Sequence, residues 1–124
     1  AAGERFVKLN QRPSGIFAGN DEMAMAFIAA IREHGLSCPA DVSVIGFDDI
    51  SLSQSYAPRL TTMRQPREAI GRRATKLLID IVERARDDHL PAHVLLRSEL
   101  VVRESTAPFR LANPQLAADR AMQS

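Results

Sequence analysis

The chain has 124 residues, which suits one domain with its own core and is too short for two full domains. Sixteen basic and fifteen acidic residues leave a net charge of +1, without the basic excess that tight DNA binding by this chain would need. No apolar run approaches the ~20 residues of a membrane span. Cys38 is the single cysteine, and the first six residues lack a signal-peptide core, so we expect a cytoplasmic protein.

The first half of the chain is typical of a strand, a helix and a second strand. The apolar run 15–19 predicts a buried strand. A helix is expected over 22–34, with Asn20 or Asp21 as its N-cap. Residues 42–47 predict the next strand. In such a βαβ unit the two strands run parallel, which predicts an α/β fold: a parallel sheet with helices on both faces.

The second half continues this alternation. Residues 51–59 are polar and predict an irregular connection, after which 60–65 predict a third strand. A long amphipathic helix is expected over 67–86. The apolar pieces 94–96 and 100–102 predict either one bent strand or one arm of a hairpin.

Polar side chains follow the first two strands at the points where they end. Asn20 and Asp21 follow the first strand, and Asp48 and Asp49 follow the second. Ligands of open parallel sheets bind beyond the carboxyl ends of the strands, so these side chains are expected to share one crevice. Carboxylate and amide groups there suit a polyhydroxylated ligand such as a sugar or a ribose. The alternative is purely structural: the first pair caps a helix and the second pair closes a strand.

Other chemistries find less support in the sequence. An Mg²⁺-dependent enzyme would place the metal on Asp21, Asp48 and Asp49, but no further Asp or Lys stands at a later strand end. No phosphate-binding glycine loop or hydrolase motif occurs, and His34, His89 and His93 lack partners at metal-ligand spacing, so we expect surface histidines, no metal and no cofactor. Cys38 has no nearby histidine and is interpreted as a structural or exposed thiol.

The predicted helix over 22–34 is apolar at nine consecutive positions, 23–31. This leaves no polar side for water over more than two turns, so something is expected to cover its outer side. We interpret that side as a subunit interface with Met25 and Ala29 on or near it, which Leu52 and Tyr56 could join. The alternative is an alanine-rich helix that tolerates water.

Four motifs in this order and spacing resemble the C-terminal part of a LacI/GalR-family transcriptional regulator. They cover about residues 14–108: GIFAGNDEMAM, HGLSCPADVSVIGFDDI, PRLTTMRQPREAIGRRATKLLID and LRSELVVRESTAP. The resemblance implies a periplasmic-binding-protein-like core of two α/β subdomains with an effector between them. In the family a helix-turn-helix reads operator DNA, and that part is absent from this chain.

The resemblance also implies site residues. Asn20 and Asp48 match polar effector contacts, Asp21 matches a usually structural acid, and Phe47 or Gln65 approaches the ligand or the hinge. The family's dimer surface corresponds to five positions: Ala24, Met25, Phe27, Ile28 and Tyr56.

The family topology divides this chain into parts. Residues 14–65 and 93–105 would form one three-layer subdomain, 66–92 would carry a helix of the other subdomain, and 107–124 would be a flexible tail. The apolar stripe of the helix over 67–86 would then lack its sheet. We expect that helix to fold back onto its own sheet, to exchange with a neighbouring chain, or to reflect a larger parent protein.

The sequence therefore predicts the effector-binding and dimerisation portion of a repressor that responds to a small metabolite, a sugar or a nucleoside-like compound. No catalysis is expected. The alternatives are a sugar-binding protein of a transport system, which shares the fold, and the small Mg²⁺-dependent enzyme.

Overall fold

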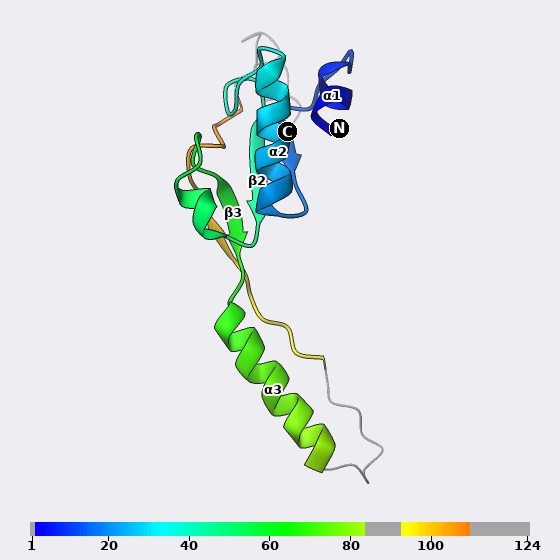
Figure 1. Cartoon of the computed structure of the whole chain (residues 1–124), viewed down its shortest axis with the longest axis vertical. Helices are drawn as coiled ribbons and strands as arrows, with labels where there is room; N and C mark the ends of the chain where they lie inside the picture. Colours follow the sequence, from blue (N-terminus) through cyan, green and yellow to red (C-terminus); the bar gives the residue numbers. More distant parts are fainter. Residues whose placement is uncertain (1, 84–92, 110–124) are drawn as a thin grey trace, which may run out of the picture.

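A computed structural model describes residues 2–83 and 93–109 of the chain. Figure 1 shows a body of sheet and helices from which one long helix projects. In chain order the elements are α1 (Ala2–Val7), β1 (Gly15–Phe17), α2 (Asp21–Glu33), β2 (Ser43–Phe47), the 3₁₀ helix η1 (Ser51–Gln54), β3 (Thr61–Arg64), α3 (Arg67–Glu83) and β4 (Glu99–Val101).

The four strands form one sheet in the order β1-β2-β3-β4. β1, β2 and β3 run parallel, and β4 pairs antiparallel with β3. Phe17 pairs with Ile45, and Phe47 pairs with Met63. The predicted parallel arrangement of the first strands is confirmed, and with it the shared sheet edge at which they end.

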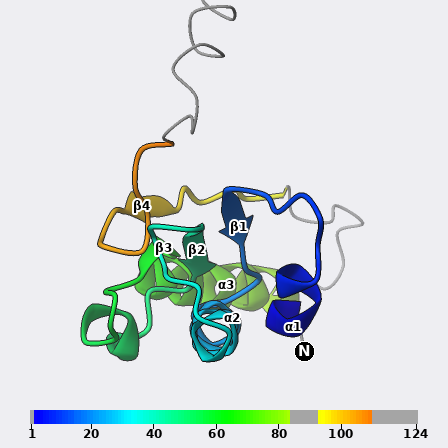
Figure 2. The same cartoon turned by 90° about the horizontal axis from the view of Figure 1, so that it is seen from above.

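Both α1 and α2 lie on the same face of the sheet, as the view from above shows (Figure 2). The core between helices and sheet includes Ala24, Ile28 and Ile31 of α2 together with Val44 and Leu60. The α/β class is confirmed. The expected second helix layer is not found among residues 2–83 and 93–109, so the described chain has two layers where the sequence predicted three.

α2 has the N-cap and the following glycine that its sequence predicts. Asn20 is the N-cap: its side-chain oxygen Oδ1 accepts a hydrogen bond from the backbone N–H of Met23 at 2.8 Å. Gly35 follows the helix with φ +78°, a left-handed conformation that glycine adopts without a steric penalty. The helix starts at Asp21, one residue earlier than expected, and the carboxylate of Asp21 is directed into the protein.

α1 was not predicted, and it covers part of the apolar surface of α2. Phe6 is 5 % exposed and stacks edge-to-face on Phe27, with ring centroids 5.2 Å apart. Gly3 allows the close approach, because a Cβ at this position would lie 2.5 Å from Cβ of Ala30. A contact within the chain therefore covers a surface that the sequence assigned to a subunit partner.

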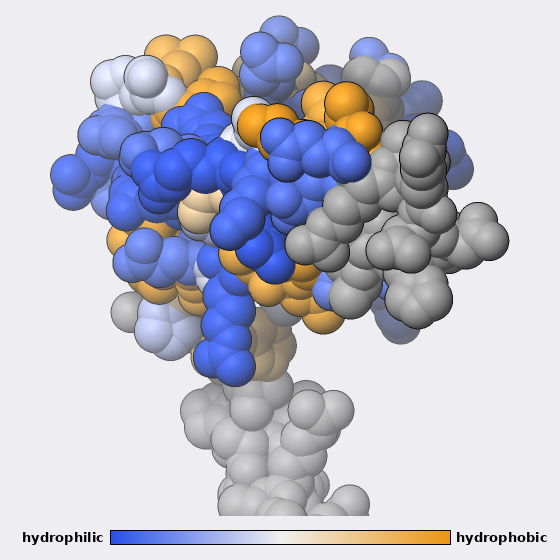
Figure 3. Space-filling view, turned by 90° about the horizontal axis from the view of Figure 1, so that it is seen from below, coloured by the Kyte–Doolittle hydropathy of each residue, from blue (hydrophilic) through white to orange (hydrophobic). Residues whose placement is uncertain are grey.

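α3 is unlike the other elements, because none of its residues is buried. Leu78, Ile81 and Val82 are 61, 48 and 67 % exposed. The expectation that this helix folds back onto its own sheet is wrong: Figure 1 shows it projecting away from the body. Seen from the α3 end, hydrophobic groups alternate with hydrophilic ones rather than forming one broad patch (Figure 3). Residues 84–86 of the predicted helix lie outside the described residues.

The returning segment is less regular than predicted. Residues 94–96 form no strand, and only 99–101 pair with β3. Beyond β4, Ser105 is fully buried and joins two strands: its hydroxyl accepts from the backbone N–H of Thr61 at 2.8 Å and donates to the carbonyl of Val44 at 2.7 Å. Of the predicted tail, residues 107–109 form no helix or strand, and 110–124 lie outside the described residues.

Candidate functional site

Three polar side chains follow the parallel strands at the edge where these strands end. Asn20 and Asp48 each lie three residues beyond a paired position, Phe17 and Ile45 respectively. Gln65 lies two residues beyond Met63, the β3 partner of Phe47. All three side chains are partly exposed. The sheet therefore brings together residues of the predicted effector group, since parallel strands place their carboxyl ends on one side.

Asp21 has a different role from the side chains around it, because its carboxylate is fully buried. Oδ2 accepts from the Ser53 hydroxyl at 2.6 Å and from the Ile50 N–H at 2.9 Å, and Oδ1 accepts from the Thr62 hydroxyl at 2.5 Å. These donors come from the segment after β2, from η1 and from β3. Asp21 therefore fixes the loops around the site and has no oxygen left for a ligand, which agrees with the structural role that the family resemblance implies.

Asp49 is also buried and is held by two arginines. Its Oδ2 lies 2.6 Å from Nε of Arg64, and its Oδ1 lies 2.6 Å from Nη2 of Arg103. Arg103 additionally donates to the carbonyl of Leu60 at 2.7 Å. Burial alone would raise the pKa of Asp49, but the hydrogen bonds and charges of Arg103 and Arg64 outweigh it and hold the pKa below the ordinary value.

Asp48 precedes Asp49 in the chain, and its side chain is held by fewer hydrogen bonds than that of Asp49. Both residues of the turn have positive φ, 109° at Asp48 and 52° at Asp49, a conformation that costs energy for residues other than glycine. The N–H of Asp48 donates to the carbonyl of Met63 at 2.9 Å. Its Oδ1 accepts from Nε2 of Gln65 at 2.5 Å. Within the described part of the chain no donor reaches Oδ2, so this oxygen can accept a hydrogen bond from a ligand.

An aromatic pair lies beside the polar group. Phe47, which the resemblance assigned to the site, packs edge-to-face against Phe17 with centroids 6.5 Å apart. Phe17 is 63 % exposed and was not predicted. Sugars and bases both bind to aromatic surfaces through their apolar faces. The sequence signal for Phe17 is its position on β1: Ile16 packs against the core, so its neighbour must point to the opposite face.

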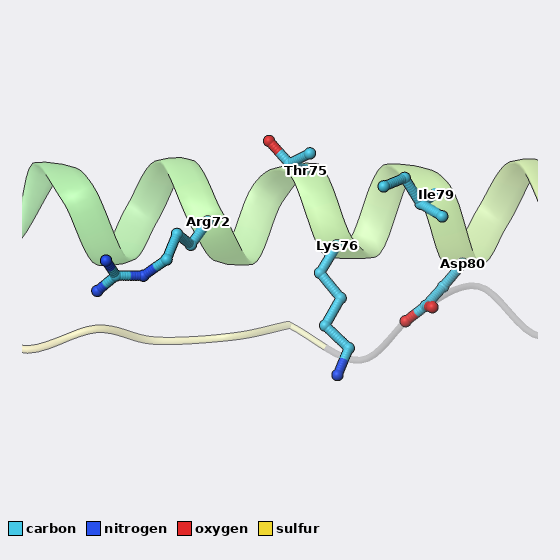
Figure 4. A pocket seen from close by; sticks show the side chains of 5 residues that line it. All are labelled: Arg72, Thr75, Lys76, Ile79 and Asp80. Atoms are coloured by element: carbon cyan, nitrogen blue, oxygen red, sulfur yellow. The ribbon is translucent and has the colours of Figure 1, made fainter.

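Two surface hollows lie along α3. One is formed by side chains of α3 alone, with Arg72, Lys76 and Asp80 on one side of the helix (Figure 4). It includes no predicted site residue. Because a single helix lines it, it does not enclose a space in which a ligand would be held. The other has a volume of about 450 Å³, lies between α3 and the segment 93–98, and includes Gln65 and Pro66. Gln65 thus joins the sheet edge to the base of α3.

The described histidines, His34 and His93, and Cys38 belong to no cluster that could hold a metal ion. No group of three or more metal-binding side chains occurs in the described ranges. His34 and His93 are exposed, and His89 lies outside those ranges. Cys38 is half-buried: its thiol donates to the carbonyl of Ser105 at 3.2 Å, and burial raises its pKa to about 11. It is therefore a structural thiol with little thiolate at neutral pH.

The residues assigned to a dimer surface lie mostly inside this chain. Four of them are buried: Ala24, Met25, Phe27 and Ile28. Tyr56 is partly exposed, and its hydroxyl donates to the carbonyl of Met25 at 3.1 Å. The residues of α2 that face solvent are their neighbours, among them Met23, Ala26 and Ala29.

The sheet, with polar turns where its three parallel strands end, defines a class, and comparison with known proteins identifies it. Residues 1–106 match the family described as periplasmic binding protein-like domain. The chain belongs to this family. Within it, similar proteins include a transcriptional repressor and LacI family regulators, as the motifs of the sequence indicated.

One such relative is the HTH-type transcriptional repressor PurR of Pectobacterium atrosepticum. It is 43 % identical over 112 residues, which are 88 % of this chain and 32 % of the repressor. The chain therefore spans about a third of the length of the curated relatives it matches.

Two of the similar proteins have solved structures, and in each the matched part is less than half of that chain. A LacI family regulator of Enterococcus faecalis with bound ribose is 32 % identical, with a TM-score of 0.76 over 88 % of this chain and 39 % of that one. The lac repressor dimer bound to operator and an anti-inducer is 30 % identical, also with a TM-score of 0.76, over 86 % of this chain and 36 % of that one.

These results weigh against the two alternatives. The curated relatives are repressors, which favours a regulator over a transport protein. For the Mg²⁺-dependent enzyme, two of the three proposed ligands are already engaged, because Asp21 accepts three hydrogen bonds and Asp49 pairs with two arginines.

Among the described residues, the structure contains no helix with the length and apolar character of a membrane span.

We predict that the arginine pairs of Asp49 make stability depend on acid pH. The pKa of Asp49 is lower in the folded chain than its unfolded value of about 3.9, so the pairs stabilise the fold fully above that value and less as the pH falls through the folded pKa. Urea unfolding at pH 7 and at pH 3 measures this. Asp49→Asn should lower the free energy of unfolding by about 2 kcal/mol at pH 7 and by much less at pH 3. An equal loss at both pH values would contradict the prediction.

Proposed function

We propose that this chain forms one wall of the effector site, and a dimerisation surface, of a LacI-type transcriptional repressor. The observation that carries the proposal is the common sheet edge of β1, β2 and β3, at which Asn20 and Asp48 each keep a polar atom for a ligand. Asn20 uses Oδ1 as a helix cap and retains its amide N–H groups as donors. Asp48 retains Oδ2 as an acceptor.

This pair of groups suits a ligand with neighbouring hydroxyls. A hydroxyl both donates and accepts, so one can donate to Asp48 and another can accept from Asn20. Phe17 and Phe47 supply an apolar surface beside them. We therefore propose a sugar or a ribose-containing compound as effector, bound without chemical change. The similar regulator from Enterococcus faecalis, which has ribose bound, supports this class of ligand.

The control of DNA binding is proposed from the relatives. In the complete repressor, a helix-turn-helix outside this chain would bind the operator in the cytoplasm. Effector binding would change the relation between the two subdomains, and thereby the spacing of the DNA-binding heads in the dimer. Residues 14–65 and 93–105 would belong to one subdomain and α3 to the other, which would supply the sheet that its apolar stripe lacks.

The coding sequence upstream of Ala1 provides a direct test of the class. We expect it to encode a helix-turn-helix about 200 residues before this chain, since the relatives are roughly three times as long. A secretion signal in the same place would instead identify a transport protein.

Ligand binding tests the roles of the polar residues. In an NMR titration of the 124-residue chain with ribose, adenosine and lactose, we expect amide shifts at Asn20, Asp48 and Phe47. Asp48→Ala should weaken binding at least tenfold, because one charge-assisted hydrogen bond contributes about 1.5 to 3 kcal/mol. Asp41→Ala, an exposed acid in the loop before β2, is the control. Equal affinities for Asp48→Ala and the unsubstituted chain would reject the role of Asp48.

Self-association tests the dimer surface. We propose that the solvent side of α2, with Met23, Ala26 and Ala29, continues from the buried residues into the contact between copies. Ala29→Arg would place a charge in that contact and should shift the chain to monomer in sedimentation velocity. Ala40→Arg, exposed in the loop before β2, should leave the association unchanged. A dimer that tolerates Ala29→Arg would place the interface elsewhere.

A further inference from the structure

The proposed effector contact of Asp48 depends on the orientation of its carboxylate. The backbone of this residue does little to fix that orientation. The backbone of Asp48 has φ 109°, and its N–H is bonded to the carbonyl of Met63. Its side chain is partly exposed and has one hydrogen-bond donor among the described residues, Nε2 of Gln65 at 2.5 Å. This single contact therefore decides which carboxylate oxygen faces a ligand.

Gln65 is itself well placed to be an anchor. Its carbonyl accepts from the N–H of Arg67 at 2.8 Å, at the first turn of α3. Its predecessor Arg64 is bound through Nε to the buried Asp49 at 2.6 Å. Two consecutive residues at the end of β3 thus hold the two consecutive carboxylates of the turn after β2, of which Asp49 is buried and Asp48 is partly exposed.

We propose that Gln65 is a positioning residue for the effector site: its amide holds Oδ1 of Asp48 so that Oδ2 is presented to the ligand. This inference rests on the proposed function and gives Gln65 a different role from the direct ligand contact that the sequence indicated. An amide nitrogen only donates hydrogen bonds, so it can hold a carboxylate oxygen without competing as an acceptor for ligand hydroxyls.

A double-mutant cycle on ligand affinity separates this role from the others. The variants are Gln65→Leu, which keeps much of the volume but cannot donate, Asp48→Ala, and the two combined. Gln11→Leu, a substitution of an exposed glutamine between α1 and β1, is the matched control. The probe is whichever of ribose, adenosine and lactose binds the unsubstituted chain most tightly by NMR.

Positioning predicts that Gln65→Leu weakens binding about five- to tenfold, and that the double variant binds no more weakly than Asp48→Ala alone. If Gln65 instead contacts the ligand independently, its effect persists in the Asp48→Ala background. If Gln65 blocks Asp48, Gln65→Leu tightens binding. Either result overturns the proposal.

A measurement without ligand keeps the proposal testable if none of the probes binds. Hydrogen exchange of the Asp48 amide, which is bonded to Met63, should accelerate about tenfold in Gln65→Leu and remain unchanged in Gln11→Leu. Gln65→Asn, which keeps the amide on a shorter side chain, should recover part of the protection. Absence of binding with accelerated exchange would refute the proposed function alone, whereas unchanged exchange in a folded Gln65→Leu chain would refute the positioning role.

Discussion

The buried carboxylate of Asp21 is the constraint on which the rest of the site depends. It is fully enclosed, and its three donors come from three different segments. Gly46 makes room for it, because a Cβ at that position would lie 2.2 Å from Oδ1. A buried charge is tolerated only when its hydrogen bonds are satisfied, so the helix start, the loop after β2 and β3 must keep one mutual arrangement. Asn20 and Asp48 are the neighbours of those segments and take their places from it.

The site therefore divides into a rigid interior and an adaptable rim. Asp21 and Asp49 are buried and paired, whereas Asn20 and Asp48, each adjacent in sequence to one of them, are partly exposed and incompletely paired. This arrangement separates folding from recognition. In the proposed effector site, changes at the rim would alter ligand binding without disturbing the buried network that keeps the turns in place.

The sequence predicted those elements whose signals are local. Asn20 and Gly35 mark the two ends of α2, and the βαβ spacing correctly predicted that β1 and β2 run parallel. The sequence did not predict the features that depend on contacts between residues far apart along the chain. α1 is short and is held by the contact of Phe6 with Phe27, and Arg103 reaches Asp49 from 54 positions along the chain. The apolar length of α2 indicated a covered surface correctly, but it could not indicate that α1 of the same chain covers part of it.

The form of α3 has a mechanical consequence. Its 17 residues make a rod of about 25 Å that is joined to the body at Gln65. A rod of this length works as a lever: a rotation of roughly 10° at its base displaces its far end by about 4 Å. A movement of about one ångström at the end of β3 therefore becomes a several-fold larger displacement at the far end of α3. Any domain that packs against that end would move with it.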